Sequence, residues 1–131
     1  YPALRIVVDH GAKPDIASGR WQPWADDLAA LAAEPQVVCK LSGLWTEAAP
    51  DAPVSALAPA MRHVLACFGA GRVLWGSDWP VLERAGDYAH WHAAVSALLL
   101  PQQRTEVFDA VARRVYRLGR APTSGAPGAG T

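Results

Sequence analysis

The sequence lacks an excess of either charge. Its 131 residues include 12 lysines and arginines against 12 aspartates and glutamates, so the formal net charge is zero. Nucleic acids and anionic membrane surfaces attract proteins that carry an excess of basic side chains. We therefore expect neither nucleic acid nor a membrane as a partner.

Cysteines are few, and long apolar runs are missing. Cys39 and Cys67 stand among apolar neighbours without the spacing of a metal site, and buried, reduced thiols favour a cytoplasmic location. No stretch reaches the roughly 18 apolar residues of a membrane span, and the first residues lack the features of a signal peptide. Because the chain opens with Tyr1, a lost leader stays open as an alternative.

What the sequence does have is a large apolar share. Hydrophobic residues make up 51% and charged residues 18%, which is typical of a globular protein with a substantial core. Residues 119–131 are the exception, since they are mostly glycine, alanine, proline and small polar residues. This segment has almost nothing to bury, and we expect it to be a disordered tail.

Three short β-branched runs predict strands, at residues 4–9, 37–41 and 72–75. Each run is apolar almost throughout rather than alternating, which is typical of parallel strands that are buried on both faces. Apolar residues at helical spacing between and after these runs predict helices at residues 24–33, 54–68, 88–99 and 102–118.

The fold class is therefore α/β, built from parallel (β/α) units. A TIM-type barrel needs eight strands, and three do not close one. Two interpretations follow: the chain is the C-terminal part of a (β/α)8 barrel, or it is a small open α/β sheet.

Polar side chains stand where each predicted strand ends. Asp9 and His10 follow the first strand, Lys40 and Ser42 end the second, and Ser77 and Asp78 follow the third. A single aspartate at a strand end is often a turn former or a helix cap. In a barrel, however, the carboxyl ends of the strands meet at the active site, so three such ends in succession favour a common pocket.

The same segments resemble a known family. Residues 7–16 resemble its D-H-x-G-x-P segment, residues 40–44 its K-L-S-G strand, residues 68–81 its F-G-x-x-R-x-x-x-G-S-D-W-P segment, and residues 112–118 its closing A-x-x-x-Y-x-L helix. This family is amidohydrolase-2, which includes L-fuconolactonase-like and pyrone-dicarboxylate-lactonase-like enzymes. The resemblance implies that residues 1–118 are the C-terminal portion of an amidohydrolase barrel.

The resemblance also implies a chemistry. It gives Asp78 the role of the general base that activates a water molecule, and His10 that of polarising a substrate carbonyl or bonding the leaving oxygen. The expected function is hydrolysis of a lactone or related cyclic ester, with a small molecule as partner and no cofactor required. In the alternative, Asp78 is a ligand of a divalent metal such as zinc.

Other residues are weaker candidates. We expect Lys40, Ser42, Trp45 and Trp79 to bind substrate, although packing explains either tryptophan equally well. Strand alternation predicts that Asp9 points away from the pocket and holds a loop. His63 is expected on the surface. His90 and His92 are expected on different sides of one helix, which argues against a metal pair.

Parts of the family pattern have no counterpart in the chain. The strand-one H-x-H and the basic residues of the middle strands are missing, so we expect these 131 residues alone to be inactive, with unpaired edge strands. Two alternative functions remain open: a metal-dependent decarboxylase of the same superfamily, and a non-catalytic truncated α/β module. The oligomeric state and the identity of the substrate stay open as well.

Overall fold

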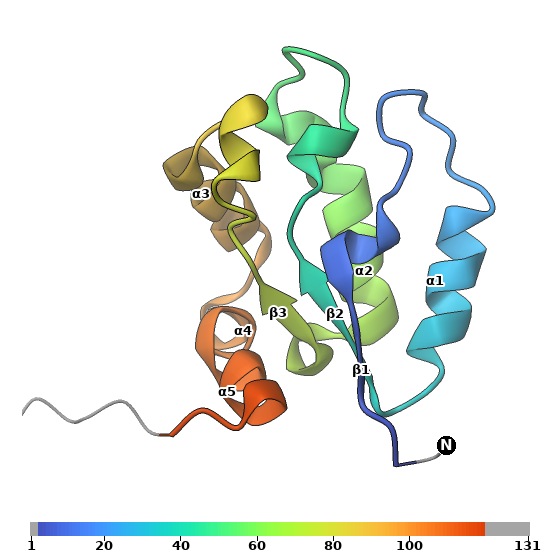
Figure 1. The fold of residues 1–131 in the computed structure, drawn as a ribbon, viewed down its shortest axis with the longest axis vertical. Coiled ribbons are helices and arrows are strands. Elements are labelled where there is room, and N and C mark those ends of the chain that lie inside the picture. Colours follow the sequence, from blue (N-terminus) through green and yellow to red (C-terminus); the bar gives the residue numbers. More distant parts are fainter. Residues whose placement is uncertain (1–2, 120–131) are drawn as a thin grey trace, which may run out of the picture.

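A computed structural model describes residues 3–119 of the chain, so the disordered tail expected at 119–131 lies, apart from Gly119, outside the described residues. The sheet has three parallel strands in the order β1-β2-β3: β1 is Ile6–Val8, β2 is Val37–Leu41 and β3 is Val73–Trp75. The three predicted strands are therefore confirmed, and the chain forms parallel βα units (Figure 1).

Helices follow each strand. The α-helices are α1 (Trp24–Ala32), α2 (Ala58–Phe68), α3 (Tyr88–Leu98), α4 (Pro101–Thr105) and α5 (Val111–Tyr116). Short 3-10 helices are found at Asp9–Ala12, Trp45–Glu47, Val54–Leu57, Ala70–Arg72 and Val81–Arg84. The predicted helix at 54–68 begins as one of these 3-10 turns. The predicted helix at 102–118 is α4, a π-helical turn at Glu106–Ala110, and α5 in succession.

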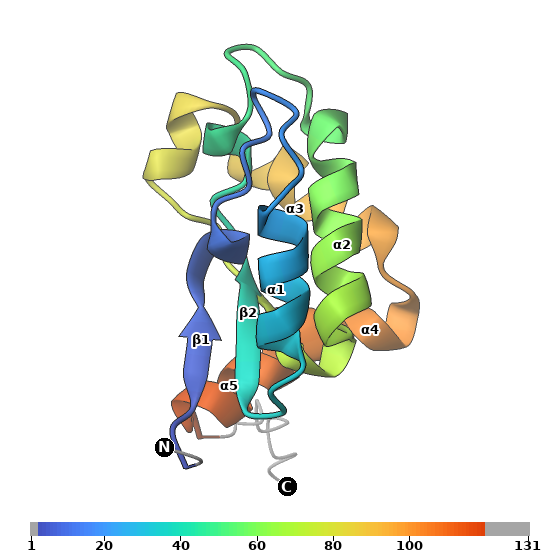
Figure 2. The ribbon, with the colours of Figure 1, turned by 90° about the vertical axis from the view of Figure 1, so that its right-hand side faces the viewer.

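The helices cover the sheet unevenly. α1 and α2 lie side by side along one face (Figure 2), and alternate residues of β2 on that side, Val37, Cys39 and Leu41, are fully buried in the main core. α4 and α5 lie beside β3, at the other end of the sheet (Figure 1). The intervening residues of β2, Val38 and Lys40, are only partly covered. One sheet face thus carries the core, and the other is open enough to present polar groups.

The expectation that all three strands are buried on both faces is wrong: β2 is only partly covered on one face, and β1 is more exposed still. Ile6 keeps 39% of its surface exposed, whereas Val73 and Leu74 of β3, which is also an edge strand, are buried because the segment at Glu106–Ala110 and α5 pack on β3. β1 also ends earlier than predicted. Val8 is its last residue, since His10 and Gly11 adopt left-handed φ angles of 49° and 55° that cannot continue a strand.

Arg72 fixes the relative position of β3 and the α1–β2 connection. Its guanidinium donates hydrogen bonds to the carbonyl oxygens of Ala32 at 2.9 Å, Glu34 at 3.0 Å and Val37 at 3.2 Å. A planar group with several donors suits this arrangement, since it reaches diverging acceptors at once. Arg72 therefore ties the start of β3 to the α1–β2 connection, at the end of the sheet opposite the carboxyl ends of the strands. None of the helices described in residues 3–119 combines the length and apolar character that crossing a bilayer requires.

Candidate active site

His10 is the second residue after β1 and is held by Ser42, the residue that follows β2. Its Nδ1 atom is 2.8 Å from Ser42 Oγ, and Ser42 is almost fully buried at 1% exposure. The next residue, Gly43, has a φ of +61°, and a Cβ atom built there would lie 2.5 Å from His10 Nδ1. The imidazole therefore rests against bare backbone, which only glycine permits at that distance.

Asp78 approaches His10 from the end of β3. Its Oδ1 atom is 3.7 Å from His10 Nε2, and its backbone has a left-handed φ of +59°. The preceding Gly76 lies so close to Ser42 that a Cβ atom there would stand 3.1 Å from the serine Cβ. The Trp91 indole donates a 2.9 Å hydrogen bond to the Gly76 carbonyl oxygen, which fixes the segment that leads to Asp78.

Asp9 belongs to the same group of side chains. Its Oδ1 is 3.1 Å from Lys40 Nζ and its Oδ2 is 3.6 Å from His10 Nε2. The expectation that Asp9 points away from the pocket is therefore wrong. Alternation holds only while the backbone stays extended, and here the backbone turns immediately after Val8. Lys40 faces this group and not the helix layer.

The Asp9–Lys40 contact shifts both ionisation equilibria. Burial raises the pKa of Asp9, but the hydrogen bond and charge of Lys40 and the charge of His10 outweigh it, so the net pKa is lowered. Burial lowers the pKa of Lys40, but Asp9 and the Tyr116 hydroxyl outweigh it, so this net pKa is raised. Each charged form therefore stabilises the other, and both groups are ionised at neutral pH.

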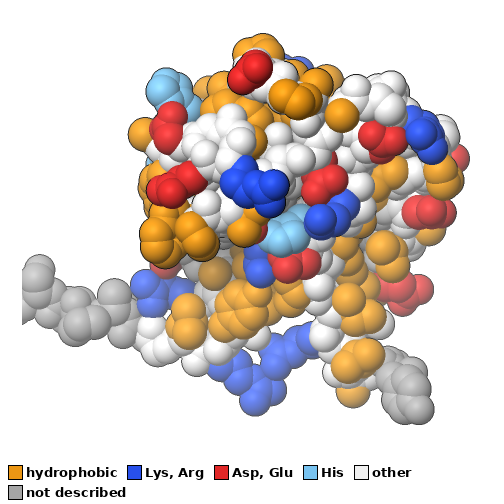
Figure 3. All heavy atoms as spheres, turned by 45° about the horizontal axis from the view of Figure 1, so that its top comes forward, with side chains coloured by type: hydrophobic (Ala, Val, Ile, Leu, Met, Phe, Trp, Pro, Cys, Tyr) orange, Lys and Arg blue, Asp and Glu red, His pale blue; other side chains and the backbone are white. Residues whose placement is uncertain are grey.

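We call these five side chains, which meet at the carboxyl ends of the strands, the strand-end cluster: Asp9, His10, Lys40, Ser42 and Asp78. Histidine, acidic and basic side chains gather in the middle of this face in Figure 3. A carboxylate and an imidazole 3.7 Å apart can contact the same small molecule. Such a pair can accept a proton from water and donate a hydrogen bond to an oxygen of the same substrate.

The two tryptophans that were candidates for substrate binding lie elsewhere. Trp45 is buried, its indole donates to the Ala52 carbonyl oxygen at 2.9 Å, and it lines a separate cavity beside the cluster. Trp79 keeps 64% of its surface exposed and donates to Glu83 at 3.0 Å. No hydrogen bond or ion pair within residues 3–119 joins either indole to the strand-end cluster.

The remaining histidines lie outside the cluster. The expectation that His63 is a surface residue is wrong: it is half-buried between α1 and α2, where its Nε2 is 3.0 Å from the Ala25 carbonyl oxygen. His90 is exposed and pairs with Asp87, the residue that caps α3. His92 stacks on Phe108, 4.4 Å between ring centroids, on another side of the helix.

The described residues do not by themselves fit a catalytic zinc. Across residues 3–119, no three side chains of His, Cys, Asp or Glu are grouped closely enough to hold a metal ion together. A catalytic zinc ordinarily takes three protein ligands, while His10 and Asp78 offer two donors. We therefore derive no step of the chemistry through a metal.

The sequence did not reveal several parts of this geometry. The Asp9–Lys40 ion pair, the contact of Gly43 with His10 and the hydrogen bond from Trp91 all join segments far apart in the chain. One signal was available: a glycine adjoins the polar residues at each strand end. Glycine beside a candidate catalytic residue often marks a close approach of backbone and side chain.

Functional side chains at the carboxyl ends of parallel βα units are typical both of (β/α)8 barrels and of open α/β sheets, and the match to solved amidohydrolase structures assigns this chain to the first class, as part of one barrel. The family follows from comparison with known proteins. A model of the amidohydrolase family matches residues 1–118, and the chain belongs to this family.

Similar proteins of known sequence or structure agree with this assignment. The chain is 49% identical over 127 residues to an L-fucono-1,5-lactonase of Burkholderia ambifaria, covering 92% of the chain and 44% of that protein. It is 36% identical to an L-fucono-1,5-lactonase of Burkholderia multivorans, covering 86% of the chain and 43% of that protein. A crystal structure of an amidohydrolase from Burkholderia multivorans with bound zinc is 35% identical, with a TM-score of 0.81 over 90% of the chain and 45% of that structure. The chain thus spans less than half the length of these relatives.

Proposed function

We propose that the full-length protein that carries this sequence hydrolyses a sugar lactone of the L-fucono-1,5-lactone type. The observation that carries the proposal is the 3.7 Å approach of His10 Nε2 to Asp78 Oδ1 at the carboxyl ends of β1 and β3. Two relatives named L-fucono-1,5-lactonase, at 49% and 36% identity, support the substrate class.

In the proposed reaction, Asp78 acts as the general base. Its carboxylate accepts a proton from a water molecule, and the water oxygen bonds to the lactone carbonyl carbon. The bond between that carbon and the ring oxygen then breaks, and the ring oxygen takes up a proton to become a hydroxyl. The products are a carboxylate and one released proton, so the overall reaction adds one water molecule to the lactone.

His10 polarises the carbonyl or bonds the leaving oxygen in this proposal. When the Ser42 hydroxyl donates to Nδ1 across 2.8 Å, the neutral imidazole carries its proton on Nε2, the atom that faces Asp78. A proton there can be shared with a substrate oxygen placed between the two side chains. Ser42 is then a positioning residue, which selects the tautomer rather than contacting the reacting atoms.

Lys40 supports the ionised state of Asp9. Its ammonium group is 3.1 Å from the Asp9 carboxylate, and its hydrogen bond and charge help to lower the pKa of that carboxyl group. We propose that Lys40 also offers one donor to substrate hydroxyl groups.

Whether the protein needs a divalent metal and where it is located in the cell are further parts of the proposal. A divalent metal such as zinc, with Asp78 as one ligand, would need donors from outside residues 3–119. The metal-dependent decarboxylase and the non-catalytic module remain as alternatives, and the lactonase names of the two curated relatives favour hydrolysis over both. A cytoplasmic location stays a prediction from the two free cysteines.

The test compares Asp78→Asn with Asp27→Asn in the full-length protein. Asp27 is exposed on α1, so its substitution removes the same charge away from the cluster. Hydrolysis of L-fucono-1,5-lactone releases protons, which a pH indicator follows continuously. We expect Asp78→Asn to lower kcat by at least about a hundredfold, the low end for loss of a general base, while Asp27→Asn keeps the parent rate.

Two controls make the result interpretable. Asparagine tolerates the left-handed backbone of residue 78, so equal urea midpoints for the parent and Asp78→Asn show that the fold is retained. The assay is repeated with a chelator and with 2,6-dihydroxybenzoate in place of the lactone. Near-parental lactone turnover by Asp78→Asn, or turnover of the aromatic acid alone, would refute the proposal.

A further inference from the structure

A cavity of about 420 Å³ lies on the same side of the molecule as the strand-end cluster, and none of the five cluster residues lines it. It is lined by the loop at residues 45–51, by the turn at residues 81–85 and by Lys13. These segments follow the three strand ends in the chain, so the cavity stands at the rim above the cluster. Its volume falls within the range of small-molecule sites, about 300–1,000 Å³.

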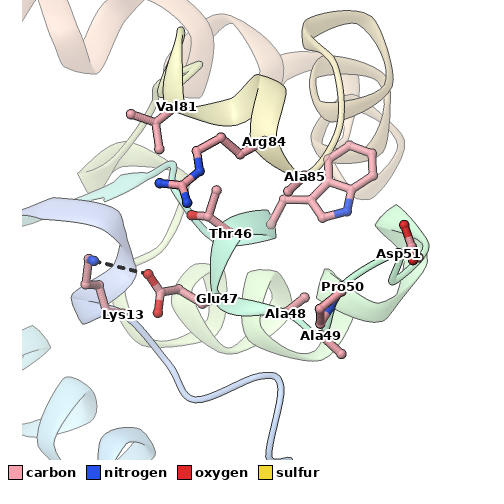
Figure 4. Close-up of a pocket in the computed structure, with 11 residues that line it drawn as sticks. Lys13, Thr46, Glu47, Ala48, Ala49, Pro50, Asp51, Val81, Arg84 and Ala85 are labelled. Carbon is pink, nitrogen blue, oxygen red and sulfur yellow. Dashed lines mark ion pairs between the residues drawn. The ribbon is translucent and has the colours of Figure 1, made fainter.

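Arg84 is the distinctive group of this cavity. The other cation, Lys13, is 3.2 Å from Glu47 and forms an ion pair with it. Arg84 forms no ion pair with any carboxylate in the described range 3–119. Its neighbour Glu83 instead accepts a hydrogen bond from the Trp79 indole. Figure 4 shows Arg84 and Thr46 pointing into the space that they share with the Lys13–Glu47 pair.

The segment that carries Arg84 is held firmly. A Cβ atom at Gly86 would stand only 2.4 Å from the Trp45 ring, so the chain after Arg84 packs directly on this tryptophan. The Trp45 indole is itself fixed by a hydrogen bond to the Ala52 carbonyl oxygen. Leu82 N donates to the Asp78 carbonyl oxygen at 2.9 Å, which links the turn to the proposed general base. Arg84 is thus presented on a preorganised support.

We propose that this cavity binds the carboxylate of the ring-opened hydroxy acid through Arg84, an inference that rests on the proposed function. Hydrolysis turns a neutral lactone into an anion, so the negative charge appears only in the product. A guanidinium with unpaired donors recognises a carboxylate through two parallel hydrogen bonds, and it has no such partner on the lactone. The cavity therefore receives the product beside the site where it forms.

The rest of the cavity suits a polyhydroxylated acid. Thr46 Oγ1 donates to the Gly43 carbonyl oxygen at 3.2 Å, which leaves its lone pairs free to accept from a ligand hydroxyl. The Glu47 carboxylate adds further acceptors, and the Trp45 ring provides an apolar wall. A sugar acid has one anionic group, several hydroxyl groups and apolar C–H faces. The guanidinium, the oxygen acceptors and the aromatic wall of the cavity match these three parts in turn.

Binding is measured directly by NMR, from the indole N–H resonance of Trp45 in the 15N-labelled full-length protein. The resonance is assigned as the one that is missing from the Trp45→Phe variant. L-fuconate, the acid that corresponds to L-fucono-1,5-lactone, is titrated alongside its uncharged polyol L-fucitol and inorganic phosphate. We expect L-fuconate to shift the resonance, L-fucitol to leave it in place, and phosphate, which a guanidinium also binds but which lacks the hydroxylated chain, to shift it less. Arg84→Gln should weaken L-fuconate binding about tenfold, because glutamine lacks the charge of the exposed guanidinium and cannot make both parallel hydrogen bonds to the carboxylate. Arg62→Gln, on the exposed side of α2, should bind like the parent.

Three outcomes overturn the inference: no shift with L-fuconate, an equal shift with phosphate, or unchanged affinity in Arg84→Gln. Binding does not require turnover, so the experiment separates the two proposals. A protein that fails to hydrolyse the lactone but binds L-fuconate through Arg84 would refute the proposed function and retain the hydroxy-acid site. A protein that hydrolyses the lactone without binding L-fuconate at Trp45 would do the opposite.

Discussion

Replacing Gly43 with alanine tests whether the position of His10 matters for activity. The added Cβ would stand 2.5 Å from His10 Nδ1, whereas nonbonded carbon atoms prefer about 3.5 Å or more, so the ring must move by roughly 1 Å. That displacement breaks the 2.8 Å contact with Ser42 and changes the approach of Nε2 to Asp78. A misplacement of about 1 Å lowers rates about a hundredfold, and we expect this loss in kcat/KM.

Alanine at residue 43 also strains the backbone, because the φ of +61° is left-handed. That strain costs about 1–2 kcal/mol for any residue with a Cβ. Gly19 is the control, since its φ is also positive, at +70°, and a Cβ there meets nothing within 4 Å. Gly19→Ala should lose stability in urea denaturation and keep its lactone turnover. If both variants retained the same turnover, the placement of His10 by Gly43 would be irrelevant and the reasoning would fail.

Three further predictions concern ionisation and stability. The pKa of Asp9 is lowered from 3.8, so the Asp9–Lys40 ion pair contributes its full stabilisation of the fold above that pH. This stabilisation is lost as the pH falls through the lower pKa that Asp9 has in the folded state. The raised pKa of Lys40 keeps the pair intact beyond pH 10.5. The parent should therefore exceed Asp9→Asn in stability by about 0.5 kcal/mol at pH 7, as for exposed pairs, and this difference should shrink in urea titrations as the pH falls below 3.8. Burial raises the pKa of the Cys39 thiol to about 12, so a Cys67→Ala variant should not react with a disulfide reagent at pH 8 until urea unfolds it. Arg72→Lys carries its three donors on one nitrogen and cannot reach the separate acceptors of the two guanidinium nitrogens, so it should lower stability by about 1–3 kcal/mol, and an unchanged urea midpoint would contradict this role.

The sequence predicts the regular elements well because their signals are local. The run at 37–41 is β-branched and apolar, and β2 has those bounds. The spacing of apolar residues from 88 onward gives α3 to within a residue. Where the prediction fails, the cause lies in tertiary packing. His63 looks like a surface residue in its own helix, yet α1 packs over it and supplies the Ala25 carbonyl as its partner.

The candidate site is predicted in its residue types but not in its directions. Periodicity assigns side chains to faces only while the backbone remains extended. His10 and Asp78 both have left-handed φ angles, so neither direction follows from the alternation of the strand before it. The same departure brings Asp9 towards Lys40 instead of the loop that alternation predicts.

The places where the backbone leaves the strand conformation are also those that bring the functional groups together. A carboxylate and an imidazole from strands separated by β2 can meet only if each chain turns inward over the end of the sheet, which the left-handed residues achieve. Such a close approach requires a residue without a Cβ atom. Gly43 allows the contact with His10, and Gly76 allows the contact with Ser42. A polar residue at a strand end next to glycine is therefore a stronger indication of an active site than the polar residue alone, because the pair encodes both the group and the space that it occupies.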